Sequence, residues 1–257
     1  MPAFHHGDVR LQYQVLGEGP PLMLVPGFNG TGEFWAPVAQ RLAARWRIIL
    51  PSYRATTPTT ADLMAGDLQA VLDHAGIDRA CVAGHSFGSA QCQLLALRAP
   101  HRLRRLVLSA TFAHLDGVPR RWFELRRQLL ELAGVEAFVR LGTLASYSPD
   151  WLQRNFAAVQ AREAEIAAGT PPLALLQARI DALLRFDSRD RLRELDVPTR
   201  VIAAADDALT PLSLSHEVAD AIPGALLQVL DDGGHSFPRS QPAAYAQALE
   251  DFFGAGR

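Results

Sequence analysis

The chain has 257 residues and a formal net charge of −2, so nothing in its charge favours binding to nucleic acid or to an anionic membrane. Hydrophobic residues make up 49% and charged residues 20%, proportions that are typical of a folded globular protein and exclude a disordered one. All 25 basic residues are arginine, which excludes a catalytic lysine.

The N-terminus, residues 1–8, has neither a basic start nor an apolar run, so we expect no signal peptide. No apolar stretch reaches the roughly 18 residues that a membrane span needs. Cys81 and Cys92 lack the spacing of a zinc site or of a disulfide framework, and we predict that both are small core residues. These features predict a cytoplasmic protein that acts on a small molecule, with an oligomeric state that the sequence does not define.

Strands and helices alternate along most of the chain. Residues 9–15 alternate apolar and polar side chains, as a half-exposed antiparallel strand does. Short continuous apolar runs then follow, which are typical of parallel strands covered on both faces. They lie at 22–25, 48–50, 81–83, 106–108, 201–204 and 226–230. Helical patterns lie at 34–45, 60–75, 87–98, 213–221 and 241–253. This alternation predicts a doubly wound α/β sheet, in which ligands bind beyond the carboxyl ends of the strands.

One region departs from this alternation, because residues 113–195 have an almost purely helical pattern. Within it, Ser148 and Pro149 have the composition of a helix start and Gly169 that of a helix end, and a further helix runs from 170 to about 186. We therefore predict a core formed by 1–112 and 196–257, with 113–195 inserted as a helical cap over the strand ends.

Two features in and next to this region predict which side chains are buried and which are exposed to solvent. Trp122, Leu125, Leu129 and Leu132 share one face of a predicted helix. The arginine-rich stretches at 98–127 and 179–193 are interpreted as solvated charges, with binding of a substrate anion as the alternative.

The motif Gly84-His85-Ser86-Phe87-Gly88 lies between an apolar strand and a helix. A G-x-S-x-G sequence in that context is typical of the nucleophile elbow of a serine hydrolase, where a tight turn exposes the serine. We therefore predict Ser86 as the nucleophile. An ordinary glycine-rich loop between strand and helix is the structural alternative.

A serine hydroxyl needs a nearby base and an acid that orients it, and both should follow later strands in the order acid, then histidine. Asp207 follows the apolar run 201–204, and His235 follows the run 226–230. We predict His235 as the general base and Asp207 as the acid. Asp206 is expected to brace its loop, and Asp116 is a minor alternative for the acid.

The tetrahedral intermediate also needs two backbone N–H donors for its oxyanion. The amide of Phe87 follows the nucleophile directly and starts a helix. The second donor should come from the loop 26–30 after the first buried strand, with the amide of Phe28 as the candidate. This chemistry needs no metal and no organic cofactor.

Taken together, these motifs resemble the α/β-hydrolase fold superfamily over nearly the whole chain. The resemblance rests on Gly17–Pro21, on Gly84–Gly88, on Asp207 with Pro211, and on Gly234-His235. It implies a mostly parallel, eight-stranded sheet flanked by helices, with the helical cap inserted.

Two branches of the superfamily are similar in detail. The aminoacrylate and carbamate hydrolases of pyrimidine utilisation are similar at 28–35, at 148–151 and at 205–207, and the 3-oxoadipate enol-lactonases in length and at 184–187. The chain departs from the superfamily pattern in two loops. It has Pro26-Gly27 where His-Gly is usual, and residues 51–58 lack the usual Asp and Gly-x-Gly.

The resemblance and the motifs together predict a serine hydrolase that cleaves an acyl bond of a small carboxylic ester, lactone, thioester or carbamate. Phe28, Asn29, Trp122 and Trp151 are the predicted substrate-binding residues, and Phe123 and Phe138 are further candidates for the pocket wall. A lyase, perhydrolase or acyltransferase with the same triad stays open, as does a small-molecule receptor with little turnover.

Overall fold

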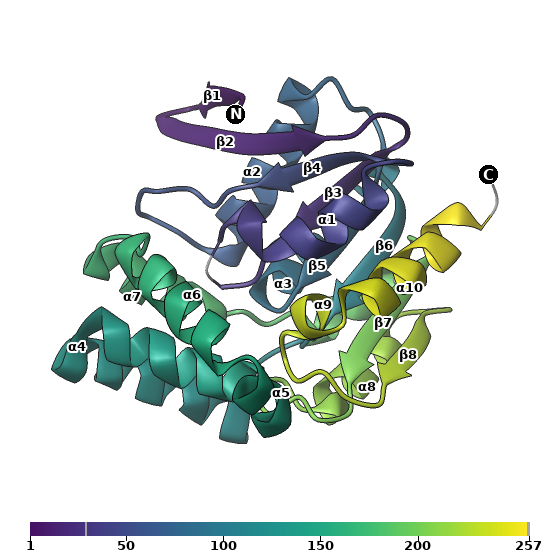
Figure 1. Cartoon of the computed structure of the whole chain (residues 1–257). Coiled ribbons are helices and arrows are strands. Elements are labelled where there is room, and N and C mark those ends of the chain that lie inside the picture. The colour runs from purple at the N-terminus through teal and green to yellow at the C-terminus, as the bar shows by residue number, and fades with distance from the viewer. Residues whose placement is uncertain (29, 256–257) are drawn as a thin grey trace.

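The computed structural model describes residues 1–28 and 30–255. In this part of the chain, eight strands form one sheet in the order β1-β2-β4-β3-β5-β6-β7-β8 (Figure 1). The strands are β1 (Ala3–His6), β2 (Val9–Leu16), β3 (Pro21–Val25), β4 (Arg47–Pro51), β5 (Ala80–His85), β6 (Leu103–Ser109), β7 (Thr199–Ala204) and β8 (Leu226–Leu230).

β2 pairs antiparallel with both β1 and β4, and all other neighbouring strands pair in parallel. The predicted fold class is confirmed, including the antiparallel strand at 9–15. β1 was not predicted, because it has only four residues and three of them are exposed. β8 also differs from the expectation of a strand covered on both faces: it forms the other edge of the sheet, and each of its residues is exposed or half-buried.

Helices cover both faces of the sheet, and the alternation of strand side chains explains why. Met23 and Val25 of β3 point into one hydrophobic cluster with α2 and α3, while Leu22 and Leu24 point into a second cluster with α1 and α10. The covering helices are α1 (Ala36–Leu42), α2 (Ala61–His74), α3 (Phe87–Arg98), α8 (Leu212–Ala221), α9 (Phe237–Ser240) and α10 (Pro242–Gly254).

Between β6 and β7 the chain leaves the sheet and forms a block of helices (Figure 1). They are α4 (Gly117–Ser146), α5 (Pro149–Arg154), α6 (Phe156–Ala168) and α7 (Leu173–Leu184). The Ser148 hydroxyl accepts a hydrogen bond from the Trp151 amide, as expected for the residue that caps the start of a helix. The helix predicted from there to Gly169 is interrupted at Asn155, where α5 ends and α6 begins.

The face of α4 that is buried differs from the apolar face identified in the sequence. Leu125 and Leu132 are 47% and 88% exposed, whereas Phe123, Arg126 and Leu130 are buried. α4 is not one regular helix, since Gly134 has a non-helical backbone with a φ of 78°. The buried stripe also contains an arginine, which a search for apolar periodicity does not count.

Cys81 and Cys92 are both buried in the core, as predicted. None of the helices in residues 1–28 and 30–255 has the length and apolar character that crossing a membrane requires.

The glycines of the elbow are expected to tolerate no side chain. A Cβ on Gly88 would lie 2.3 Å from the Pro26 carbonyl oxygen and 2.6 Å from that of Val25. We expect Gly88→Ala to lower the free energy of unfolding by about 1–3 kcal/mol, because two backbone segments would have to separate. Urea denaturation measures this change. Gly254→Ala is the matched control, because a Cβ there meets nothing within 4 Å; equal effects of the two substitutions would contradict the prediction.

Candidate active site

The turn between β5 and α3 presents Ser86 at the carboxyl end of the sheet. Ser86 has a φ of 53° and a ψ of −123°, a strained conformation for a residue with a side chain. Hydrogen bonds hold this conformation from both sides. The Ser86 amide donates to the Ser109 carbonyl of β6 at 2.8 Å, and the Ser86 carbonyl accepts from the Ser89 amide and hydroxyl at 2.8 and 2.6 Å.

Ser86, His235 and Asp207 lie in a single hydrogen-bonded chain. The Ser86 Oγ is 2.9 Å from His235 Nε2, and His235 Nδ1 is 2.8 Å from Asp207 Oδ2. All three side chains are buried, with residue exposures of 3%, 7% and 6%. With Nδ1 protonated, His235 donates to the carboxylate and leaves Nε2 free to accept from the serine hydroxyl.

The two adjacent aspartates after β7 have different partners. The Asp207 carboxylate accepts from the Leu209 and Thr210 amides at 2.9 Å each and from the Thr210 hydroxyl at 2.7 Å, in addition to His235. Asp206 instead accepts from the Gly233 and Gly234 amides at 3.3 and 2.8 Å. Asp206 therefore braces the loop that carries the histidine, as expected.

Asp116, the alternative candidate for the acid, lies elsewhere. Its carboxylate is 3.1 Å from the Nε2 of His114 and is largely exposed to solvent. The structure thus brings Asp207, and not Asp116, to His235.

The two predicted oxyanion donors flank the serine. Phe87 is the first residue of α3, so its amide has no acceptor within the helix. Gly27 packs directly against the elbow, since a Cβ there would be 3.4 Å from the Ser86 Cβ, and Phe28 follows it. In the described part of the chain, neither the Phe87 nor the Phe28 amide has a hydrogen-bond acceptor. Asn29, predicted to bind substrate, lies outside the described residues.

The unusual segment 51–58 supports this loop. The Tyr53 hydroxyl donates to the Pro26 carbonyl at 2.6 Å, and the Tyr53 amide donates to the Gly30 carbonyl at 3.0 Å. Arg54 next to it forms a buried bidentate ion pair with Asp67, with both N–O distances at 2.7 Å. The segment therefore positions the loop with an aromatic residue and a buried ion pair, a role that its divergent sequence did not reveal.

Aromatic side chains of the helical block contact the loop that carries Phe28. The Phe28 ring is 6.1 Å from the Phe123 ring and 6.0 Å from the Phe138 ring. The two tryptophans predicted to bind substrate lie differently. Trp122 is half-buried next to Phe123 on α4, and Trp151 is half-buried on α5, where its ring stacks on Tyr147 at 4.3 Å. A substrate-binding role for these residues stays a prediction.

The helical block is also tied to the loop of the histidine. The Ser236 amide donates to the carbonyl of Ser146, the last residue of α4, at 2.8 Å. Gly234, with a φ of 65°, allows this close approach, because a Cβ there would be 2.8 Å from the same carbonyl oxygen. The backbone on both sides of His235 therefore packs against the end of α4.

Two arginines in the stretches interpreted as solvated charges are buried instead. Arg126 of α4 and Arg179 of α7 are 6% and 4% exposed, which corrects that interpretation for both. Arg179 donates to the Arg54 carbonyl at 3.2 Å and lies over the Tyr53 ring, so it supports the segment described above.

A second histidine is buried beside His235. The His85 ring stacks on Phe34 at 4.8 Å and lies 5.0 Å from the His235 ring. Among residues 1–28 and 30–255, neither of its nitrogens has a hydrogen-bond partner. Burial, and secondarily the nearby His235, hold the pKa of His85 well below its ordinary value. His85 is therefore a neutral packing residue at neutral pH.

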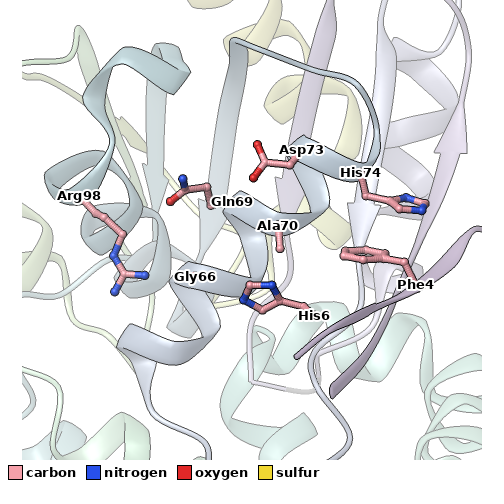
Figure 2. A pocket seen from close by; sticks show the side chains of 8 residues that line it. All are labelled: Phe4, His6, Gly66, Gln69, Ala70, Asp73, His74 and Arg98. Atoms are coloured by element: carbon pink, nitrogen blue, oxygen red, sulfur yellow. The ribbon is translucent and has the colours of Figure 1, made fainter. Parts of the chain in front are cut away.

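Two surface pockets in the structure contain no residue of the Ser86-His235-Asp207 chain. One lies between β1 and α2, and Figure 2 shows the side chains that line it, among them Phe4 stacked on His74. In the described residues, no group of three or more His, Cys, Asp or Glu side chains is placed to hold a metal ion.

Comparison with known proteins identifies the class. The α/β-hydrolase fold family model matches residues 20–238. A protein of Azorhizobium caulinodans named "Putative carbamate hydrolase RutD" is 39% identical over 261 aligned residues, which cover 99% of this chain and 98% of that protein. A protein of Caulobacter sp. strain K31 with the same name is 36% identical and covers 96% and 97% of the two chains.

Solved structures agree on the fold. A hydrolase from Pseudomonas aeruginosa superposes with a TM-score of 0.89 at 28% identity and covers 99% of this chain and 98% of that one. The enol-lactonase from Burkholderia xenovorans has the same TM-score at 23% identity, with 98% and 100% covered, and shows the shared fold. The chain therefore belongs to the α/β-hydrolase fold family. It is a hydrolase.

The buried His85 predicts a dependence of stability on pH. Its pKa is lowered in the folded protein, so the unfolded chain binds one more proton as the pH falls below the unfolded value of about 6.5. The free energy of unfolding should therefore fall below that pH, with His85 contributing up to about 1.4 kcal/mol per pH unit. Urea denaturation at about pH 7 and about pH 5 measures the slope.

The variant His85→Phe should reduce this slope, because phenylalanine keeps a ring against Phe34 and cannot bind a proton. His101→Gln, at an exposed histidine, is the control. A slope for His85→Phe equal to that of the wild type would contradict the prediction.

Proposed function

We propose that the protein is a serine hydrolase that cleaves an acyl bond of a small carboxylic ester, lactone, thioester or carbamate through an acyl-enzyme. The observation that supports this proposal most directly is the Ser86-His235-Asp207 chain, with distances of 2.9 and 2.8 Å, at the carboxyl ends of three strands. We also assign residues 113–195 as a cap over this site and 1–112 with 196–257 as the core.

In the proposed reaction, the Ser86 Oγ attacks the carbonyl carbon and its proton moves to His235 Nε2. Asp207 orients the imidazole and stabilises the imidazolium that forms. The Phe28 and Phe87 amides donate to the oxyanion of the tetrahedral intermediate. His235 then protonates the leaving group, and the bond between carbonyl carbon and leaving group breaks. Water, deprotonated by His235, releases the acyl group from Ser86 and restores the enzyme.

Among the candidate substrates, a small carbamate is the first to test. Both curated relatives described above carry the name of a carbamate hydrolase and match almost the whole chain at 36–39% identity. The burial of Ser86 favours a small substrate, because a bulky one would require the cap to be displaced.

The test uses a small neutral fluorophosphonate, which reacts with activated serines, and intact mass as the readout. We expect one label on the wild-type protein, no label on Ser86→Ala, and much slower labelling of His235→Ala.

Asp207→Asn should lower kcat on a reactive ester about 10³- to 10⁴-fold, because it favours the wrong imidazole tautomer. A panel of carbamates, lactones and esters then identifies the preferred bond.

Asp206→Asn is the matched control for Asp207→Asn, because it changes the adjacent carboxylate that does not contact His235. It should lower kcat far less. A folded wild-type protein that takes no label would contradict the proposal and favour a receptor with little turnover. Equal losses in the two variants would contradict the assignment of Asp207.

A further inference from the structure

Arg126 places a buried positive charge beside the oxyanion loop. Its side chain extends from α4 into a cage of three aromatic rings, and its Cζ lies 4.2 Å from the ring centre of Phe138, 5.5 Å from that of Phe28 and 5.6 Å from that of Phe123. The residue is only 6% exposed. Cation–π contacts offset part of the cost of removing the charge from water, but a buried charge is normally also paired with an acid.

No acid pairs with it. In the described residues, no carboxylate oxygen lies within 4 Å of the Arg126 guanidinium, and its buried Nε has no hydrogen-bond partner. Arg54 of the same protein shows how a buried arginine is usually paired: it is equally buried and forms two hydrogen bonds to Asp67. Burial lowers the pKa of Arg126 to about 10, so the side chain is still a cation at neutral pH.

The packing connects the cation to the candidate reaction centre through Phe28. One of its three aromatic neighbours is Phe28, the residue whose amide is the candidate oxyanion donor, and the preceding Gly27 packs against Ser86. On its other side Gly142 provides space, since a Cβ there would lie 2.7 Å from a guanidinium nitrogen. The guanidinium therefore occupies a defined position between the cap and the oxyanion loop.

We propose that Arg126 is a specificity-determining residue that binds a carboxylate group of the substrate. This inference rests on the proposed function and adds a substrate class to it: acyl compounds that carry a free carboxylate. The planar guanidinium can donate two parallel hydrogen bonds to a carboxylate, and the apolar cage strengthens such a pair by excluding water. The bound anion would supply the partner that the folded chain lacks.

The test is calorimetric binding of two carboxylates, butanoate and benzoate, each compared with its neutral amide. We expect both carboxylates, and neither amide, to bind to the wild type and to Ser86→Ala. Arg126→Met should weaken carboxylate binding roughly 10- to 100-fold, because it removes a charge-assisted, bidentate pair but still fills the apolar cage. Arg126→Lys keeps the charge without the planar fork and should fall between the two.

Arg127→Met is the matched control. Arg127 is the next residue of the same helix, but its side chain is 40% exposed and pairs with Asp181, so its removal should leave carboxylate binding within about twofold. Thermal unfolding verifies that each variant is folded. If Arg126→Met is misfolded, the carboxylate affinity of Arg126→Lys is compared with that of the wild type instead.

Two results would overturn the inference: carboxylates that bind no better than their amides, and carboxylate binding that is unchanged in folded Arg126 variants. The fluorophosphonate experiment separates this failure from failure of the proposed function. Labelling of the wild type at Ser86 tests the triad, and calorimetry of Ser86→Ala tests carboxylate binding without the nucleophile, so the two proposals can fail separately.

Discussion

The backbone at Ser86 is the constraint on which the rest of the site depends. A φ of 53° with a ψ of −123° costs a residue with a side chain about 1–3 kcal/mol, and the protein holds it there with hydrogen bonds from β6 and from the first turn of α3. The same turn directs Oγ toward His235 and starts α3 at Phe87, so that an unpaired amide lies beside the hydroxyl. Gly84 and Gly88 are required because the strand, the helix and the segment Val25–Pro26 meet here with no room for a Cβ.

Two adjacent aspartates after β7 stabilise the surroundings of this turn in different ways. Asp207 accepts four hydrogen bonds and is therefore fixed in position before any substrate arrives. Asp206, one residue earlier, fixes the backbone of the histidine loop and not the ring. Adjacent aspartates thus divide the task, one orienting the imidazole and the other shaping the loop that carries it.

Much of this arrangement could be predicted from the sequence, because local patterns determine it. Six apolar runs and one alternating stretch identified seven of the eight strands. The positions of Asp207 and His235 after strands β7 and β8 predicted that they would meet Ser86 at one sheet edge. The distances now show that they do meet, while their catalytic roles stay proposals.

What the sequence did not reveal depends on contacts between distant segments. Tyr53 donates a hydrogen bond to the Pro26 carbonyl of a distant loop, which no local pattern indicates. Arg126 was interpreted as a solvated charge, since an arginine on a helix is usually exposed, and only the packing of three phenylalanines against it shows otherwise. Periodicity likewise assigned Leu125 and Leu132 to a common apolar face, but α4 buries a different face that includes Arg126.

The hydrogen bond from Ser236 to Ser146 ties the helical block between β6 and β7 to the loop that carries His235. It joins the last residue of α4 to the backbone immediately after His235, and Gly234 lets the two segments touch on the other side. An outward displacement of that end of α4 would break this contact and release the backbone that sets the imidazole in line with Ser86. The position of that end of α4 and the placement of the His235 imidazole against Ser86 are thereby mechanically linked.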